Sequence, residues 1–176
     1  MTYTTPNPTN CIPNGDFCIY CNKNVPLCWS STCPLNVQRL GETPALWECP
    51  RIYDYDVCLS GTDGNITTSD FIPIDITKKY LLQVVSKIST TMPIGNFLVK
   101  IESFNSSKNL IPENFWEEQP SPLMTTYATS TNLDELDFSV DCWPETAYIK
   151  ITLKIDQPST CHESWDIKSV TLTEVV

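Results

Sequence analysis

Charged residues, glycine and histidine are all scarce in this 176-residue chain. Only 18% of its residues are charged, against about 25% in an average globular protein. Acidic side chains outnumber basic ones by 21 to 11, and the net charge is −10. Such a surface repels polyanions, and no basic patch with interleaved aromatics is present, which excludes a nucleic-acid partner. No stretch approaches the roughly 20 apolar residues of a membrane span.

The scarcity of histidine and glycine also limits the chemistry. His162 is the only histidine, so a Ser–His–Asp or Cys–His relay would depend on this one residue. It follows Cys161 in a polar loop, where we expect it to be exposed. Carboxylate groups such as Asp134-Glu135 could suggest a glycosidase pair, but acids on surface strands and turns explain them. Five glycines form no loop that cradles phosphate. The sequence therefore predicts a protein that is not an enzyme.

Cysteine, by contrast, is abundant, with nine residues, of which seven lie between Cys11 and Cys58. Such a density is typical of an oxidising compartment. The first residues nevertheless have neither the basic nor the apolar region of a secretory signal. Three explanations stay open: a signal that was removed, a metal site, or late oxidation in an extracellular or spore-surface structure. We expect an extracellular or cell-surface location in either of the oxidising cases.

An odd number of cysteines leaves one thiol over after internal pairing. Each internal disulfide would add about 2–4 kcal/mol of stability by restricting the unfolded chain. Cys11 is our candidate for an intermolecular bond, because it follows an extended N-terminal arm, residues 1–10, that has no hydrophobic period. The eight cysteines predicted to pair internally are Cys18, Cys21, Cys28, Cys33, Cys49, Cys58, Cys142 and Cys161. The spacings Cys18-x-x-Cys21 and Cys28-x4-Cys33 are also compatible with a zinc thiolate site.

The rest of the chain is typical of strands. Residues 147–155 alternate between apolar and polar side chains, which predicts a half-buried strand. Lys79–Ser89 is apolar on both faces and predicts a central strand. The last strand, Ser164–Val175, changes the phase of its apolar side chains, which indicates a bulge near Lys168-Ser169.

Further strands are predicted in five segments: Asn14–Tyr20, Ile52–Leu59, Asp70–Ile76, Leu123–Ser130 and Leu136–Val140. Residues 97–102 alternate in the same way, and Asn105–Asn109 is expected to turn the chain. No helix is convincing. The fold class is therefore all-β: an antiparallel sandwich over residues 11–176, with a Cys-rich irregular N-terminal segment. We expect the sandwich from about residue 64 onward to be self-sufficient.

Three motifs occur in an order that resembles the galactose-binding-like jelly rolls, a group with many carbohydrate-binding modules. The first is Asn-Gly-Asp-Phe at 14–17, followed by Pro-Leu-Cys-Trp at 26–29. The second, at 71–82, is a strand that ends in a turn before a Tyr opens the next strand. The third is the closing strand Trp-Asp-Ile-Lys-Ser-Val-Thr-Leu at 165–172. The resemblance implies a jelly-roll fold in which Trp29 and Trp165 pack in the core.

The resemblance also bears on metal and ligand sites. Two acidic positions that often help to hold a structural calcium in the family are replaced here, although Asp16 and Asp166 could still supply oxygen ligands. Sugars stack on flat aromatic faces, and jelly rolls often present aromatics on loops or on a concave face. The candidates for this role are Trp116, Phe115 and Trp143, with Trp47 and Tyr148 as further aromatics.

Two functions follow from these observations. The first is a structural subunit of a disulfide-cross-linked fibre or layer. Residues 1–10 would add to a sheet edge of a neighbouring copy or sibling protein, and Cys11 would lock the contact. The alternative is a carbohydrate-binding module that acts in adhesion or polysaccharide recognition. A zinc-stapled domain is a third possibility.

Overall fold

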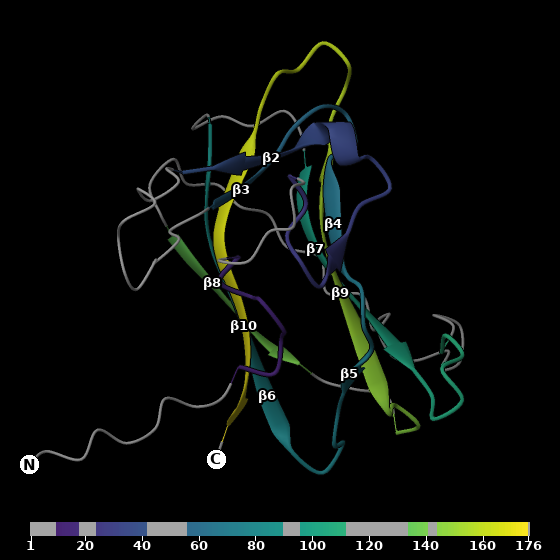
Figure 1. Ribbon diagram of the computed structural model, residues 1–176. Coiled ribbons are helices and arrows are strands. Elements are labelled where there is room, and N and C mark those ends of the chain that lie inside the picture. Colours follow the sequence, from purple (N-terminus) through teal and green to yellow (C-terminus); the bar gives the residue numbers. More distant parts are fainter. Residues whose placement is uncertain are drawn as a thin grey trace, which may run out of the picture.

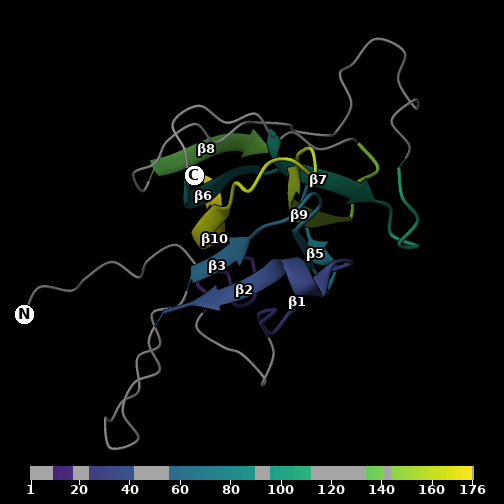
Figure 2. The same cartoon turned by 90° about the horizontal axis from the view of Figure 1, so that it is seen from above.

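Two antiparallel sheets make up the fold (Figures 1 and 2). The computed structural model describes residues 10–17, 24–41, 56–89, 96–111, 134–140 and 144–175. In sheet A the strands are β1 (Trp29–Ser30), β4 (Asn65–Thr68), β9 (Tyr148–Asp156), β5 (Ile72–Pro73) and β7 (Asn96–Phe104). In sheet B they are β2 (Val37–Leu40), β3 (Asp56–Leu59), β10 (Trp165–Val175), β6 (Lys79–Ile88) and β8 (Asp134–Val140). The all-β antiparallel prediction is confirmed.

The core lies between the two sheets and is built from alternate residues of the long strands. On β9 the inward side chains are fully buried: Ile149, Ile151, Leu153 and Ile155. Their neighbours Tyr148, Lys150, Thr152 and Lys154 are half-buried on the outer face. This is the alternation that the sequence predicts for a strand with one face on the core. The central position of β6, between β10 and β8, is confirmed as well.

The predicted bulge in the last strand is confirmed. The register between β10 and β6 shifts between Ile167 and Ser169. Trp165 and Ile167 are buried before the shift, and Val170 and Leu172 are buried after it. One extra residue reverses the phase of a strand, so the bulge keeps all four side chains in the core.

The first third of the chain belongs to the sandwich, contrary to the expectation of a self-sufficient unit from residue 64 onward. Its buried side chains include Ile12, Phe17, Trp29, Val37, Val57 and Leu59. It also contains two short strands, β1 and β2, and a 3₁₀ helix η1 (Pro34–Asn36). This segment therefore contributes side chains to the hydrophobic core. It also contains paired strands that its irregular sequence does not indicate.

The predicted strand from residue 14 is wrong for its described part, residues 14–17. Asn14 and Phe17 have φ angles of 50° and 55°, a left-handed backbone that no strand allows. The segment instead makes a turn that places Phe17 in the core against Trp29, with ring centroids 5.4 Å apart. Asn14 fixes this turn, since its carbonyl accepts the indole N–H of Trp29 at 3.2 Å. These contacts give the Asn-Gly-Asp-Phe and Trp motifs a physical reason, and the core positions of Trp29 and Trp165 are confirmed.

The start of the described chain docks beside β10, beyond the end of its pairing with β3. The backbone N–H of Cys11 donates to the carbonyl of Leu172, and that of Val170 donates to Gly15. The side chain of Asn10 accepts the N–H of Leu172 at 2.9 Å and donates to the carbonyl of Val170 at 3.2 Å. Asn10, which the sequence assigns to the arm, is therefore part of the fold.

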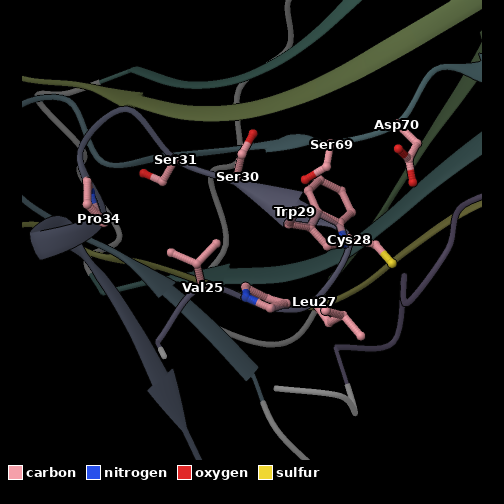
Figure 3. Close-up of a pocket in the computed structure, with 10 residues that line it drawn as sticks. Val25, Leu27, Cys28, Trp29, Ser30, Ser31, Pro34, Ser69 and Asp70 are labelled. Carbon is pink, nitrogen blue, oxygen red and sulfur yellow. The ribbon is translucent and has the colours of Figure 1, made fainter. Parts of the chain in front are cut away.

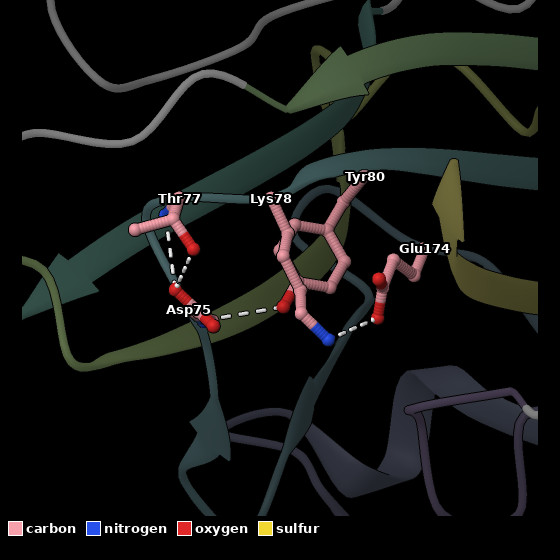
Figure 4. A network of polar contacts seen from close by, with 5 residues as sticks. All are labelled: Asp75, Thr77, Lys78, Tyr80 and Glu174. Atoms are coloured by element: carbon pink, nitrogen blue, oxygen red, sulfur yellow. Dashed lines mark hydrogen bonds and ion pairs between the residues drawn. The ribbon is translucent and has the colours of Figure 1, made fainter. Parts of the chain in front are cut away.

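The turn between β5 and β6 is held by a polar network (Figure 4). Asp75 accepts the hydroxyl and the backbone N–H of Thr77, which lowers the pKa of its carboxyl. The hydroxyl of Tyr80 accepts the backbone N–H of Asp75 at 3.1 Å. Lys78 forms an ion pair with Glu174 of β10 at 2.8 Å. This is the arrangement of turn and Tyr that the second sequence motif predicts.

Other predicted elements agree in part. Residues 105–109 form the expected turn, in which the backbone N–H of Lys108 donates to the carbonyl of Asn105. The strand predicted from residue 52 is described from Asp56 onward, and Leu123–Ser130 lies outside the described residues. None of the helices in the described ranges is long and apolar enough to cross a membrane.

Candidate functional site

The aromatic residues predicted to bind a ligand fall mostly outside the described part of the chain. Phe115, Trp116, Trp143 and Trp47 all lie there. Tyr148 is the one described member of the set, and it opens β9 on the outer face of sheet A. Tyr148 is half-buried, so part of the residue is accessible to solvent.

Tyr148 belongs to a cluster of three aromatic rings. It lies opposite Phe104 of β7 in the register of the sheet. Phe71, from the segment between β4 and β5, meets both rings nearly edge-on, with centroids 4.9 Å from Phe104 and 5.9 Å from Tyr148. Edge-to-face contacts of this kind hold rings in fixed relative orientations. All three side chains are half-buried.

Two lysines complete what we call the aromatic–lysine cluster: Phe71, Phe104, Tyr148, Lys108 and Lys150. The ammonium group of Lys150 lies 4.6 Å from the centroid of Phe71, and that of Lys108 lies 5.1 Å from it. Lys108 is also 5.7 Å from the centroid of Tyr148. Both distances to Phe71 fall within the range of cation–π attraction, about 6 Å.

A bulge between β4 and β5 places Phe71 in this cluster. Thr67 pairs with Thr152, and Ile72 pairs with Ile149, so the four residues Thr68–Phe71 lie opposite only two residues of β9. The extra residues leave the ladder, and the buried hydroxyl of Thr68 accepts the N–H of Ile151 at 3.1 Å. Bulges often redirect side chains beside functional sites, and this one sets the position along β9 at which Phe71, next to the inward Ile72, lies on the outer face.

Two further bonds anchor the bulge. Lys150 donates from its ammonium group to the carbonyl of Ser69 at 3.0 Å. The backbone N–H of Ser69 donates to the carbonyl of Cys28 at 2.9 Å, and Cys28 has a left-handed backbone with φ of 68°. The bulge is thus tied both to the cluster and to the residue that precedes β1.

A pocket of about 660 Å³ adjoins the bulge on the side of β1 (Figure 3). This volume is in the range of small-molecule sites, about 300–1,000 Å³. Its wall combines apolar side chains with serine hydroxyls and one carboxylate, that of Asp70. The lining residues are Val25, Pro26, Leu27, Cys28, Trp29, Ser30, Ser31, Pro34, Ser69 and Asp70. Because Ser69 and Asp70 precede Phe71 in the chain, the bulge connects this β1 pocket with the aromatic–lysine cluster.

Four of the cysteines predicted to form disulfides are described, and these four are unbonded: Cys28, Cys33, Cys58 and Cys161. Cys33 donates its thiol to the carboxylate of Asp63 at 3.0 Å, which raises the pKa of Cys33 and lowers that of Asp63. The other four cysteines predicted to pair, Cys18, Cys21, Cys49 and Cys142, lie outside the described residues. The disulfide framework therefore stays a prediction.

Cys58 is the most enclosed thiol of the described cysteines, with 8% of its surface exposed. It lies opposite Asp166 in the pairing of β3 with β10. Burial, and then the neighbouring carboxylate, raises the pKa of this thiol to about 12. The thiolate is the reactive form of cysteine, so this raised pKa leaves Cys58 with little reactive thiolate in the folded chain at neutral pH.

Cys11, the candidate for an intermolecular bond, is half-buried and packs against the core. Burial raises the pKa of its thiol, and the carboxylate of Glu174 raises it further, while Lys78 opposes both effects. These surroundings reduce the thiolate population at neutral pH. The bond to a second molecule remains untested.

The described residues contain no cluster of three or more His, Cys, Asp or Glu side chains that could hold a metal ion. Asp16 is exposed in the turn before Phe17, whereas Asp166 is half-buried within β10. One oxygen of Asp166 is buried without a hydrogen-bond partner in the described structure. The calcium and zinc sites stay predictions. His162 is exposed in the loop after β9, as predicted.

Sequence reasoning missed most of the aromatic–lysine cluster. Its members come from the bulge, from the end of β7, from the following turn and from β9. No short motif unites them. The available signal was the alternation along β9, which places Tyr148 and Lys150 on the same outer face.

No protein-family model matches this sequence. No curated protein matches it either. Solved structures do match. Over 94% of its length the chain resembles part of the enzymatically active domain of tailspike protein 4 from bacteriophage CBA120, with a TM-score of 0.61 and 14% identity. The match covers 21% of the tailspike chain, so this chain spans about a fifth of that protein.

Two matching structures are carbohydrate-binding modules of nearly the same extent. One is TmCBM61 in complex with β-1,4-galactotriose, with a TM-score of 0.54, 12% identity, and coverage of 95% of this chain and 99% of that one. The other is the CBM22-1 xylan-binding domain of Xyn10C from Paenibacillus barcinonensis, with a TM-score of 0.55, 6% identity and coverage of 98% of each chain. The chain thus has the jelly-roll β-sandwich fold of carbohydrate-binding modules, as its sequence motifs predict.

Proposed function

We propose that this chain is a non-catalytic carbohydrate-binding domain that acts outside the cell or at its surface. The observation that carries the proposal is the aromatic–lysine cluster on the outer face of sheet A. Ligand sites combine apolar and aromatic surface with a few fixed polar groups, and the cluster offers both. The solved modules that resemble it over their whole length support this function, since one binds a galactotriose and the other binds xylan.

The cluster and the β1 pocket would act together on an extended glycan. One sugar ring would pack on the exposed part of Tyr148, where C–H groups of the ring face the aromatic surface. The next residue of the chain would extend across Ser69 and Asp70 toward the β1 pocket, whose hydroxyls and carboxylate can bond sugar hydroxyls. The rings are fixed before binding by their contacts with one another, which limits the entropy lost on association.

The proposal is tested by affinity electrophoresis and calorimetry with a panel of galactan, xylan and polygalacturonate. We expect at least one polymer to bind, and Tyr148→Ala to weaken that binding by about tenfold or more, which corresponds to about 1.4 kcal/mol. Val175→Ala is the control, because Val175 is 48% exposed at the end of β10 in sheet B, whereas the cluster lies on sheet A. A panel without any binding, or full affinity in Tyr148→Ala, would contradict the proposal.

The cross-linked fibre or layer predicted from the cysteines requires the arm at residues 1–10 and a reactive Cys11. Only Asn10 of that arm is described, and it is bound to β10 of its own chain. The structural role remains a separate prediction, and surface adhesion through glycans would be compatible with it.

A further inference from the structure

We infer that the glycan recognised by this chain is anionic, with a carboxylate held between Lys108 and Lys150. This inference rests on the proposed function and specifies the class of sugar that the same site takes. It follows from the charge balance at the aromatic–lysine cluster, which is opposite in sign to that of the whole chain.

Among the described residues, neither of the two lysines forms an ion pair. The ion pairs among the described residues are Lys78–Glu174 and Lys100–Glu102. Lys150 lies opposite Glu102 in the register of β9 and β7, yet the carboxylate of Glu102 bonds to Lys100 at 2.6 Å instead. In a chain with 21 acidic and 11 basic residues, two cations beside one ring that have no ion pair within the described ranges are unexpected.

The backbone sets where both lysine side chains begin, and a hydrogen bond holds one of the two ammonium groups. Lys108 has φ of 62° in the turn of residues 105–109, where the side chain of Asn105 accepts the N–H groups of Ser107 and Asn109 at 3.0 Å each. Lys150 is fixed by β9 and by its bond to Ser69. A Lys ammonium carries three N–H donors, so both groups keep donors for a ligand.

The same geometry argues against a neutral sugar on Phe71. Both ammonium groups lie close to this ring, within 5.1 Å of its centroid, and compete with a stacking sugar for its surface. Tyr148 has only Lys108 near its ring, at 5.7 Å from the centroid, and a sugar on Tyr148 would bring its substituents beside the two cations. Bonds from an ammonium to a carboxylate are stronger than those to a hydroxyl, so a uronic acid gains more here than a neutral sugar.

The test compares two ligands with the same backbone. Oligogalacturonate carries a carboxylate on each sugar, and its methyl ester carries none. We expect the wild-type chain to bind the acid about tenfold or more tightly than the ester, with an affinity that falls as salt is added. Lys108→Gln/Lys150→Gln should remove both the preference and the salt dependence, whereas Lys108→Arg/Lys150→Arg, which keeps the charge, should retain them.

The matched control is Lys79→Gln/Lys87→Gln on β6, which makes the same change in net charge on sheet B. It should bind like the wild type. Thermal unfolding of each variant, with Lys108→Gln alone as the least invasive change, separates lost binding from lost folding. Equal affinity for acid and ester, or an equal loss in the control, would overturn the inference while leaving glycan binding intact. A chain that binds neither these ligands nor any neutral polysaccharide would overturn the proposed function as well.

Discussion

The thiol of Cys58 shows how a single buried residue can make stability depend on pH. Its pKa is raised from 9.0 to about 12 in the folded chain, chiefly by burial. As the pH rises above 9, the unfolded chain loses this proton while the folded chain keeps it. The stabilising contribution of Cys58 is therefore complete below pH 9 and is lost progressively toward pH 12.

We therefore predict that the wild type is more stable than Cys58→Ala near neutral pH, and that this advantage shrinks as the pH rises above 9. Denaturant unfolding of both proteins across this range measures the difference, and the comparison cancels other groups that titrate there. A difference that stays constant with pH would show that the thiol is not held in its protonated form. Alkylation followed by mass spectrometry should also label Cys58 more slowly than Cys28 in the folded chain.

At the scale of the element, the bulge between β4 and β5 depends on the hydroxyl of Thr68. This buried hydroxyl is the acceptor for the N–H of Ile151, which lies where regular pairing is interrupted. Thr68→Val keeps the shape but leaves that N–H without an acceptor. We predict a loss of about 1–3 kcal/mol in the free energy of unfolding, because a buried donor would lose its partner.

Thr67→Val is the matched control in the same strand. The hydroxyl of Thr67 bonds to the hydroxyl of Thr152 at 2.8 Å, and both side chains are half-buried, so water can replace the lost partner. We expect this variant to lose less stability than Thr68→Val in the same denaturant titration. Equal losses would mean that the bulge does not depend on the Thr68 bond.

Elements with strong periodicity could be predicted from the sequence, and those built on side-chain contacts could not. The alternation along β9 and the phase change in β10 both mark real features, because each inward side chain must reach the core. The strand predicted at Asn14 failed because the same apolar Phe17 reaches the core from a left-handed turn. Short strands such as β1 have too few residues to show a period at all.

At the scale of the whole molecule, the candidate site also could not be predicted from the sequence, because it is built on contacts between distant residues. Phe71 and Tyr148 are far apart in the chain and meet only because β5 and β7 flank β9. A two-residue excess in the bulge then decides which residues of β9 lie beside Phe71. Neither register nor bulge length can be obtained from local composition, so a fold prediction that was largely right still omitted the cluster.

Folding of the sandwich depends in the same way on contacts between distant segments, here between the first third of the chain and β10. β3 pairs with β10 along residues 165–167, and the segment at residues 10–15 bonds β10 farther along. Removing residues 1–63 would expose this side of β10 and delete the buried side chains Ile12, Phe17, Trp29, Val37, Val57 and Leu59. Each such side chain contributes about 1.5–3 kcal/mol, so together they match the whole stability of a typical domain, about 5–15 kcal/mol.

We therefore predict that a fragment of residues 64–176 does not fold, whereas the full chain unfolds cooperatively. Circular dichroism during heating and amide NMR spectra of the two proteins would make the comparison. The fragment should show no cooperative transition and little dispersion of its amide signals. A cooperative transition in the fragment would mean that the later strands form a core without the first third, and that the early segment is attached to the sandwich rather than built into it.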